Sequence, residues 1–147
     1  MNYWRILNLV SYITYNFDNI NRNQILDIIF IIDWKHTLTY WKPYLDWNKW
    51  YNDTYWPTSL NLSKIVNEII ENKEYIRTYN DKLENIFDFI NTRKEKTMEW
   101  EEILLRYILL NDLERRRLII SLYPIWVSPK YTFLDLESLA KRYKEDN

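Results

Sequence analysis

The chain has 147 residues and a net charge of -1, so it lacks the broad positive field that attracts nucleic acid. It contains no cysteine and no glycine, which excludes disulfides, thiolate nucleophiles, cysteine zinc sites and glycine-rich phosphate loops. Since the composition does not change along the sequence, and no segment reaches the roughly 18 apolar residues of a membrane span or looks like a leader, we expect a single cytoplasmic domain over residues 1–147, away from membranes.

The aromatic content is the unusual part of the composition, with 8 Trp, 13 Tyr and 5 Phe. A genome rich in A and T would favour Asn, Ile, Tyr and Lys, but it would not favour Trp, whose codon is rich in G. The Trp excess therefore needs a physical reason. Without glycine, we also expect Asn and Asp to occupy the left-handed backbone positions, because they tolerate that conformation best.

The first two predicted helices lie before residue 41. Apolar residues at helical spacing define the first: Ile6, Val10, Ile13 and Phe17. Asn21 and Gln24 have the spacing of a capping box at the start of the second. The run from 25 to 34 is apolar nearly all round, as in a helix surrounded by others. A buried strand is the alternative, but the continuation to Tyr40 exceeds the usual strand length.

The segment from Tyr40 to Trp56, which we call the aromatic connector, keeps neither a helical nor an alternating period. Its aromatic residues are Trp41, Tyr44, Trp47, Trp50, Tyr51, Tyr55 and Trp56. About half of them should be buried, yet so many within one short polar stretch are hard to hide together. Because Trp and Tyr dominate binding hot spots, we expect some of them to form an exposed surface that binds a protein partner.

The rest of the chain predicts further helices. Ser59 or Asn61 can begin one that ends near Asn72. Residues 74–91 fit either a small β-hairpin or a helix, and the pattern does not decide between them. Later helix starts and breaks are expected at Thr97, Asp112, Pro124, Pro129 and Asp135. The sequence therefore predicts a compact, mainly α (α+β) domain of five to six helices.

Polar candidates for chemistry are few. Asp33 and His36 stand three residues apart on the second predicted helix, so they share a face and could form a hydrogen-bonded acid-base pair. A structural polar contact is the more ordinary interpretation. With one His and no Cys, no spacing indicates a metal site or a cofactor. The arginines at 115–117 are expected to form a solvated helix face.

Several short motifs occur in an order that resembles the Panacea domain, the SocA-like antitoxin family of bacterial toxin-antitoxin loci and prophages. The motifs are Asn23-Gln24-Ile25-Leu26 with Ile32-Asp33-Trp34-Lys35-His36, then Tyr40-Trp41-Lys42-Pro43, Tyr55-Trp56-Pro57, Ile119-Ile120-Ser121-Leu122-Tyr123-Pro124-Ile125, Leu134-Asp135-Leu136-Glu137-Ser138-Leu139-Ala140 and Tyr143-Lys144. The closing motifs are similar to those of the phage branch. Trp41 and Trp56 stand where the family has turn glycines, so each must project outward or reshape its turn.

The resemblance implies a helical domain with a small β-hairpin, for which 74–91 is the expected place. It also implies function by binding: a non-enzymatic antitoxin that neutralises a protein target. The alternative is a phage-encoded inhibitor of a bacterial defence system. A third reading, from another class, is a metal-dependent hydrolase or nuclease that uses Asp33 and His36. A homodimer is left open.

Overall fold

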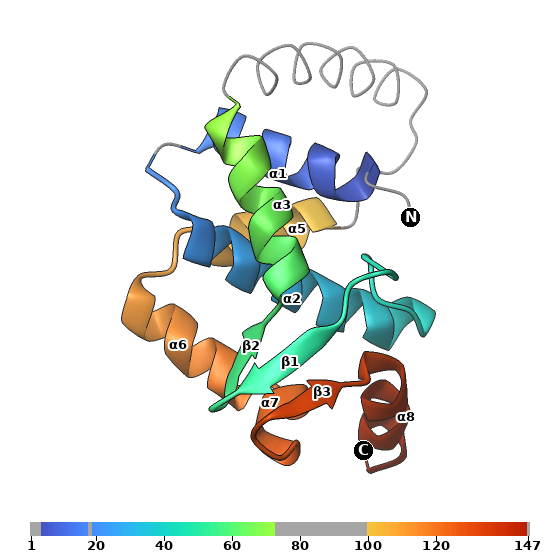
Figure 1. Ribbon diagram of the computed structural model, residues 1–147. Coiled ribbons are helices and arrows are strands. Elements are labelled where there is room, and N and C mark those ends of the chain that lie inside the picture. Colours follow the sequence, from blue (N-terminus) through green and yellow to red (C-terminus); the bar gives the residue numbers. More distant parts are fainter. Residues whose placement is uncertain (1–3, 18, 73–99, 147) are drawn as a thin grey trace.

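The structure is a computed structural model that describes residues 4–17, 19–72 and 100–146 (Figure 1). Its elements are α1 (Trp4–Asn16), α2 (Arg22–Tyr40), β1 (Trp50–Asp53), β2 (Trp56–Thr58), α3 (Leu60–Glu71), α5 (Trp100–Tyr107), α6 (Asp112–Ser121), α7 (Tyr123–Val127), β3 (Thr132–Leu134) and α8 (Leu136–Asp146). The predicted mainly helical α+β class is confirmed. Within these ranges there are seven helices rather than five to six, because Pro124 lies at the start of the short helix α7 as well as after α6.

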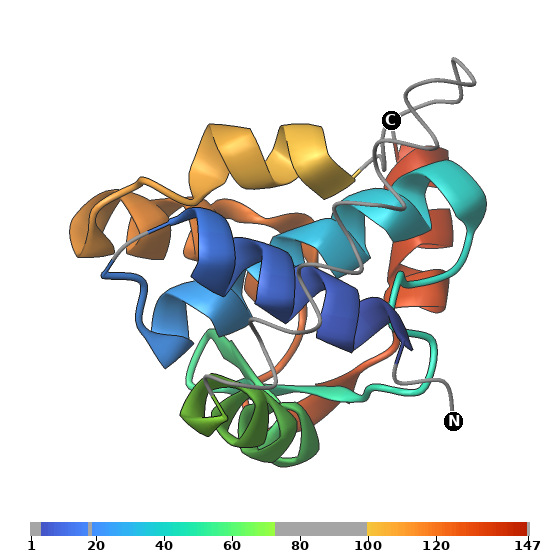
Figure 2. The ribbon, with the colours of Figure 1, turned by 90° about the horizontal axis from the view of Figure 1, so that it is seen from above.

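Helix α2 is the central element, as its apolar sequence predicted. Asn21 and Gln24 form the expected capping box: Asn21 Oδ1 accepts from the Gln24 N–H at 2.9 Å, and Gln24 Oε1 accepts from the Asn21 N–H at 3.0 Å. The helix contacts α3, α5, α6, α8 and β2. Figure 2 shows α5 on the opposite side of α2 from α3 and the strands. Burial on several sides explains why α2 carries apolar residues nearly all round.

A three-stranded antiparallel sheet, in the order β2-β1-β3, packs beside α2. Tyr51 of β1 lies opposite Thr58 of β2 and Phe133 of β3. The interpretation of residues 50–56 as part of an irregular connector was therefore wrong. Strands of four and three residues are too short for an alternating pattern to stand out. The hairpin considered at 74–91 falls outside the described residues.

Most of the left-handed backbone positions among the described residues are occupied by residue types other than Asn and Asp. Among the described residues, φ is positive at Asn19, Trp41, Thr54, Tyr55 and Tyr131, so the expectation of Asn or Asp is confirmed only at Asn19. Trp41 caps α2, and its N–H donates to the Thr37 carbonyl oxygen at 2.9 Å. Thr54 and Tyr55 form the two-residue turn between β1 and β2, where a hairpin of this length favours positive φ at both positions.

Two other helix starts agree with the sequence. Ser59 caps α3, since its Oγ accepts from the Leu62 N–H at 3.2 Å. Asp135 precedes α8, and its Oδ1 accepts from the Ser138 N–H at 3.2 Å. After Pro129, residues 130 and 131 form a turn, and the expected extended segment begins only with β3. These local signals place α3, β3 and α8 without reference to the rest of the fold.

Candidate partner-binding surfaces

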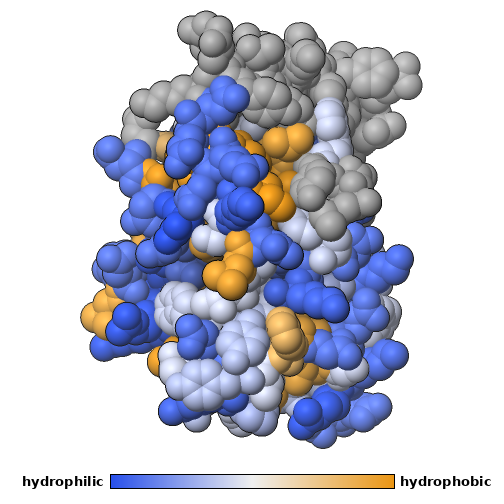
Figure 3. All heavy atoms as spheres, in the orientation of Figure 1, coloured by the Kyte–Doolittle hydropathy of each residue, from blue (hydrophilic) through white to orange (hydrophobic). Residues whose placement is uncertain are grey.

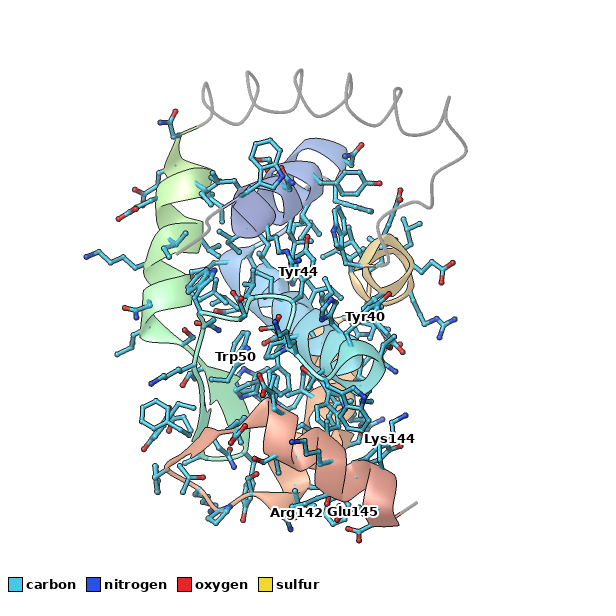
Figure 4. All side chains as sticks on the ribbon, turned by 90° about the vertical axis from the view of Figure 1, so that its right-hand side faces the viewer. Tyr40, Tyr44, Trp50, Arg142, Lys144 and Glu145 are labelled. Carbon is cyan, nitrogen blue, oxygen red and sulfur yellow. The ribbon has the colours of Figure 1, made fainter. Side chains whose placement is uncertain are left out.

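Trp50 is part of the hydrophobic core, so its prediction as a partner-binding residue was wrong. Its side chain is 1% exposed and lies edge-to-face against Phe30, with the ring centroids 5.1 Å apart. The residue occupies an inward-facing position of β1, which alternates between buried and more exposed side chains. Figure 4 shows Trp50 between its strand and α2, whereas Tyr40 lies at the outer end of α2.

Asp33 and His36 do not form the predicted polar pair. The carboxylate of Asp33 accepts from the Leu45 N–H at 2.9 Å and from the Trp50 Nε1–H at 2.8 Å. His36 Nδ1 lies 2.6 Å from the carbonyl oxygen of Lys42, which can only accept, so this nitrogen is the donor. Both residues lie on α2, as their spacing predicted, but their side chains bond to different residues of the following loop: Asp33 to Leu45 and His36 to Lys42. Both side chains hold that loop against α2.

Burial sets the ionisation of Asp33. Loss of solvation raises the pKa of this carboxyl to about 7, although the hydrogen bonds from Trp50 and Leu45 lower it. The side chain is completely buried among groups that already use its oxygens. Its geometry is that of a structural clasp and gives no access to a substrate.

Tyr40 ends α2, Trp41 caps it, and Tyr44 lies in the loop that follows. The His36 ring lies between Tyr40 and Tyr44, with centroid distances of 4.6 and 5.5 Å. Arg5 of α1 donates to the Tyr44 carbonyl oxygen at 2.8 Å and places its guanidinium 4.8 Å from the Tyr44 ring centroid. Burial raises the pKa of Tyr44. Trp41, at 45% exposure, projects into solvent, whereas Tyr44 and its neighbour Trp47 are half-buried.

Beside strands β1 and β3 lies a group of four aromatic side chains, of which three are exposed and one is half-buried. We call it the aromatic sheet face, and it consists of Tyr51, Tyr55, Tyr131 and Phe133. Tyr51 and Phe133 are cross-strand partners with ring centroids 5.2 Å apart. Tyr55 and Tyr131 lie at the same end of the sheet: the Tyr131 N–H donates to the Asn52 carbonyl oxygen at 2.7 Å, and Lys130 Nζ lies 4.8 Å from the Tyr55 ring centroid.

The aromatic stretch of the sequence indicated Tyr51 and Tyr55 but not Tyr131 and Phe133, the other two members of this face. Tyr131 and Phe133 are 62% and 69% exposed, more than the exposed aromatic residues of the connector. Both follow Pro129, but Tyr131 lies in a left-handed turn before β3, and only Phe133 belongs to the strand. No sequence pattern indicated their place beside Tyr51, because the pairing of β3 with β1 is what brings Phe133 opposite that residue.

Trp56 belongs to a different surface, beside α6. Its ring is half-buried and lies 5.9 Å from the Arg116 guanidinium. Next to it, Arg115 Nε donates to the buried Asp27 carboxylate at 2.6 Å, and Arg115 Nη2 donates to Asp112 at 2.9 Å. Arg115 is therefore buried, and the prediction of a fully solvated arginine face was wrong at that position. Burial raises the pKa of Asp27 to about 6, although Arg115 lowers it.

The described residues offer no obvious metal or membrane element. No group of three His, Asp or Glu side chains that could hold a metal ion occurs in residues 4–17, 19–72 and 100–146. In the same ranges, no helix has the length and hydrophobicity of a membrane span. The surface features described above are exposed aromatic side chains and hydrogen-bonded polar groups.

One backbone feature bears on the motif Tyr40-Trp41-Lys42-Pro43. With a φ of 64°, Trp41 has the left-handed conformation that glycine usually supplies after a helix, and its ring projects outward. Trp56 instead begins strand β2, directly after the left-handed Tyr55.

Comparison of the chain with family models, with curated proteins and with solved structures gives no match.

Proposed function

We propose that the chain is a non-enzymatic protein-binding module that neutralises a protein target in the bacterial cytoplasm, as antitoxins of the Panacea family do. The observation that carries the proposal is the aromatic sheet face. The face combines the half-buried Tyr51 with three aromatic side chains that are between 44% and 69% exposed. Figure 3 shows pale and orange side chains over the sheet, at the lower centre, with blue hydrophilic side chains around them.

Exposed aromatic rings gathered on one part of a surface favour a protein partner. Each ring buries a large, stiff surface at a small cost in side-chain entropy, and the tyrosine hydroxyls can still make hydrogen bonds across an interface. Tyr51 and Phe133 already hold each other in place, so part of this ordering is complete before binding. Such rings are typical of residues that carry most of the binding energy.

The backbone at Tyr55 and Tyr131 supports the same reading. Their φ values are 65° and 63°, a conformation that costs a side chain with a Cβ atom roughly 1–2 kcal/mol. Asn tolerates this conformation better, and this chain uses it at Asn19. A tyrosine at each strained position is explained if the exposed ring is needed for binding.

The polar residues support a binding role over the hydrolase alternative. Asp33 is buried with both carboxylate oxygens hydrogen-bonded, and His36 is bonded to a backbone carbonyl. Neither is free to act as a general base on a substrate. The Panacea-like order of motifs, together with the glycine-like backbone at Trp41, favours an antitoxin among binding modules.

Affinity capture from the cells that make the chain tests the sheet face. The variant Tyr55→Gly/Tyr131→Gly removes two exposed rings and leaves backbone positions that glycine adopts freely. Trp41→Gly is the matched control, since it removes an exposed left-handed aromatic residue at the end of α2. We expect the partner to be lost with the double variant and kept with the control. Equal recovery with all three proteins would remove the sheet face from the proposal.

Co-expression tests neutralisation itself. If the captured partner arrests growth when produced alone, the chain should restore growth, and the double variant should fail to do so. A partner that belongs to a host defence system would instead favour the phage inhibitor. Loss of neutralisation in Trp41→Gly with full activity in the double variant would move the binding surface to the end of α2.

A further inference from the structure

A second group of aromatic side chains, outside the connector, surrounds a cavity of about 460 Å³. Trp34 comes from α2, Tyr123 and Trp126 from α7, and Tyr143 from α8. The volume lies within the roughly 300–1,000 Å³ usual for ligand sites. The cavity touches neither the aromatic sheet face nor the connector, since none of their residues lines it.

Two of the four rings, those of Trp34 and Tyr123, are buried, and that of Trp126 is exposed. Trp34 and Tyr123 are buried and stack at a centroid distance of 6.2 Å with an angle of 15° between their planes. Tyr143 stands edge-on to both, at 5.9 and 5.2 Å. Trp126 stands edge-on to Tyr123 at 5.7 Å but is 61% exposed. A ligand in the cavity can therefore reach the ring of Trp126 while it contacts a rigid aromatic base.

The cavity is lined by one carboxylate, that of Asp146, and one ammonium group, that of Lys35. One of the Asp146 oxygens accepts from the Tyr123 hydroxyl at 3.4 Å. Helix α6 ends at Ser121 and α8 ends at Asp146, so the carbonyl ends of two helices lie at this cavity. Helix carboxyl ends carry partial negative charge, which Lys144 offsets in the last turn of α8, whereas α6 has no basic residue in its last turn. Aromatic faces and a carboxylate together favour a cation.

Of the basic residues Lys35, Arg142 and Lys144, Lys35 alone is among the lining residues. Lys35 lines the cavity, but its Nζ lies 6.0 Å from the ring centroid of Tyr107, which does not line it. Arg142 and Lys144 of α8 are exposed and are not among the described lining residues. Figure 4 places Arg142 and Glu145 on the side of α8 away from α2.

We propose that this cavity binds the guanidinium group of an arginine side chain presented by the protein partner, an inference that rests on the proposed binding function. A planar guanidinium can stack on the exposed ring of Trp126 and donate two parallel hydrogen bonds to the Asp146 carboxylate. An ammonium group lacks the flat face and the paired donors, so lysine fits this combination less well. The cavity then gives the partner a specificity contact separate from the sheet face.

The site can be tested without any partner by titrating the chain with blocked amino acids. N-acetyl-argininamide, N-acetyl-lysinamide and the neutral N-acetyl-norleucinamide are added to the labelled protein, and the indole N–H signals of Trp34 and Trp126 are followed by NMR. We expect argininamide to shift both signals, lysinamide to bind more weakly and norleucinamide not to bind. Equal binding by the neutral compound, or binding by lysinamide as tight as by argininamide, would overturn the proposal.

Variants locate the binding. Trp126→Ala and Asp146→Asn change exposed side chains, so both should fold, and each should weaken argininamide at least fivefold as measured from the Trp34 signal. Trp41→Ala, an exposed tryptophan at the end of α2, is the control and should bind like the original chain. Unchanged binding in either cavity variant would contradict the assignment.

The source of the arginine is tested by partner capture. Trp126→Ala and Asp146→Asn should reduce recovery of the partner that the original chain captures. Full recovery by variants that no longer bind argininamide would show that the arginine is not the partner's. Because the titration contains no partner, it can succeed when the sheet-face variants show that the proposed function is wrong.

Discussion

The indole Nε1 of Trp50 donates a hydrogen bond of 2.8 Å to Oδ2 of Asp33, and both side chains are buried. The other Asp33 oxygen accepts from the Leu45 N–H. One carboxylate of α2 therefore holds both the loop that follows the helix and the strand that carries Tyr51. This clasp fixes the position of the sheet on α2, and with it the position of the aromatic sheet face.

Two substitutions of Trp50 should distinguish the stability contributed by its buried ring from the stability contributed by its hydrogen bond. Trp50→Phe keeps an aromatic side chain but leaves an Asp33 oxygen without its donor, so we expect a loss of about 1–3 kcal/mol in the free energy of unfolding. Trp50→Ala also opens a cavity and should cost about 3–5 kcal/mol. Urea unfolding measures both. Trp41→Phe, at an exposed site, is the control, and a Trp50→Phe midpoint equal to that of the control would contradict the clasp.

Stability should fall as the pH rises from 5 to 8. The pKa of Asp33 is about 7 in the folded chain and near 4 when unfolded, so the folded state binds a proton that the unfolded state has released. The extra stability is complete below the unfolded pKa and disappears as the pH passes through 7. At about 1.4 kcal/mol per pKa unit, its upper limit is on the order of 4 kcal/mol. Asp33→Asn should reduce this slope and leave the part that Asp27 contributes through its pKa of about 6, and an unchanged slope would exclude Asp33 as a source.

Arg115 should matter far more than the arginines beside it. Arg115→Met leaves the buried Asp27 without its cation, which should raise the pKa of Asp27 above 6 and cost about 3–5 kcal/mol at pH 8. The cost should be smaller at pH 5, where Asp27 is protonated. Arg116→Met and Arg117→Met alter exposed neighbours and serve as controls. Unfolding measured at both pH values checks this, and three equal losses would mean that the ion pair contributes no more than a surface charge.

Trp41 offers a test of backbone strain at the end of α2. Because its φ is 64°, Trp41→Gly should be more stable than Trp41→Ala by about 1 kcal/mol. The two variants lose the same ring, so the comparison isolates the backbone. Thermal unfolding measures the difference. If the alanine variant is the more stable, the left-handed cap is absent in solution.

Local signals in the sequence determined a large part of the helical framework. The apolar run after Asn21 predicted the central helix, since only a helix contacted on several sides needs apolar residues nearly all round. Asn21, Ser59 and Asp135 marked helix starts because a capping side chain satisfies backbone donors only two or three residues away. Such contacts are complete within a few residues, so the sequence alone contains them.

Only the tertiary structure decided which aromatic rings are buried and which form a surface. Trp50 and Tyr51 are adjacent and alike in composition, yet the pairing of β1 with β2 and β3 turns one inward and the other outward. Phe133 reaches Tyr51 through strand pairing across about eighty residues, and Arg115 reaches Asp27 across a similar distance in the chain. Contacts at such separations depend on how the elements pack, because no local spacing or propensity encodes which distant side chain will lie opposite.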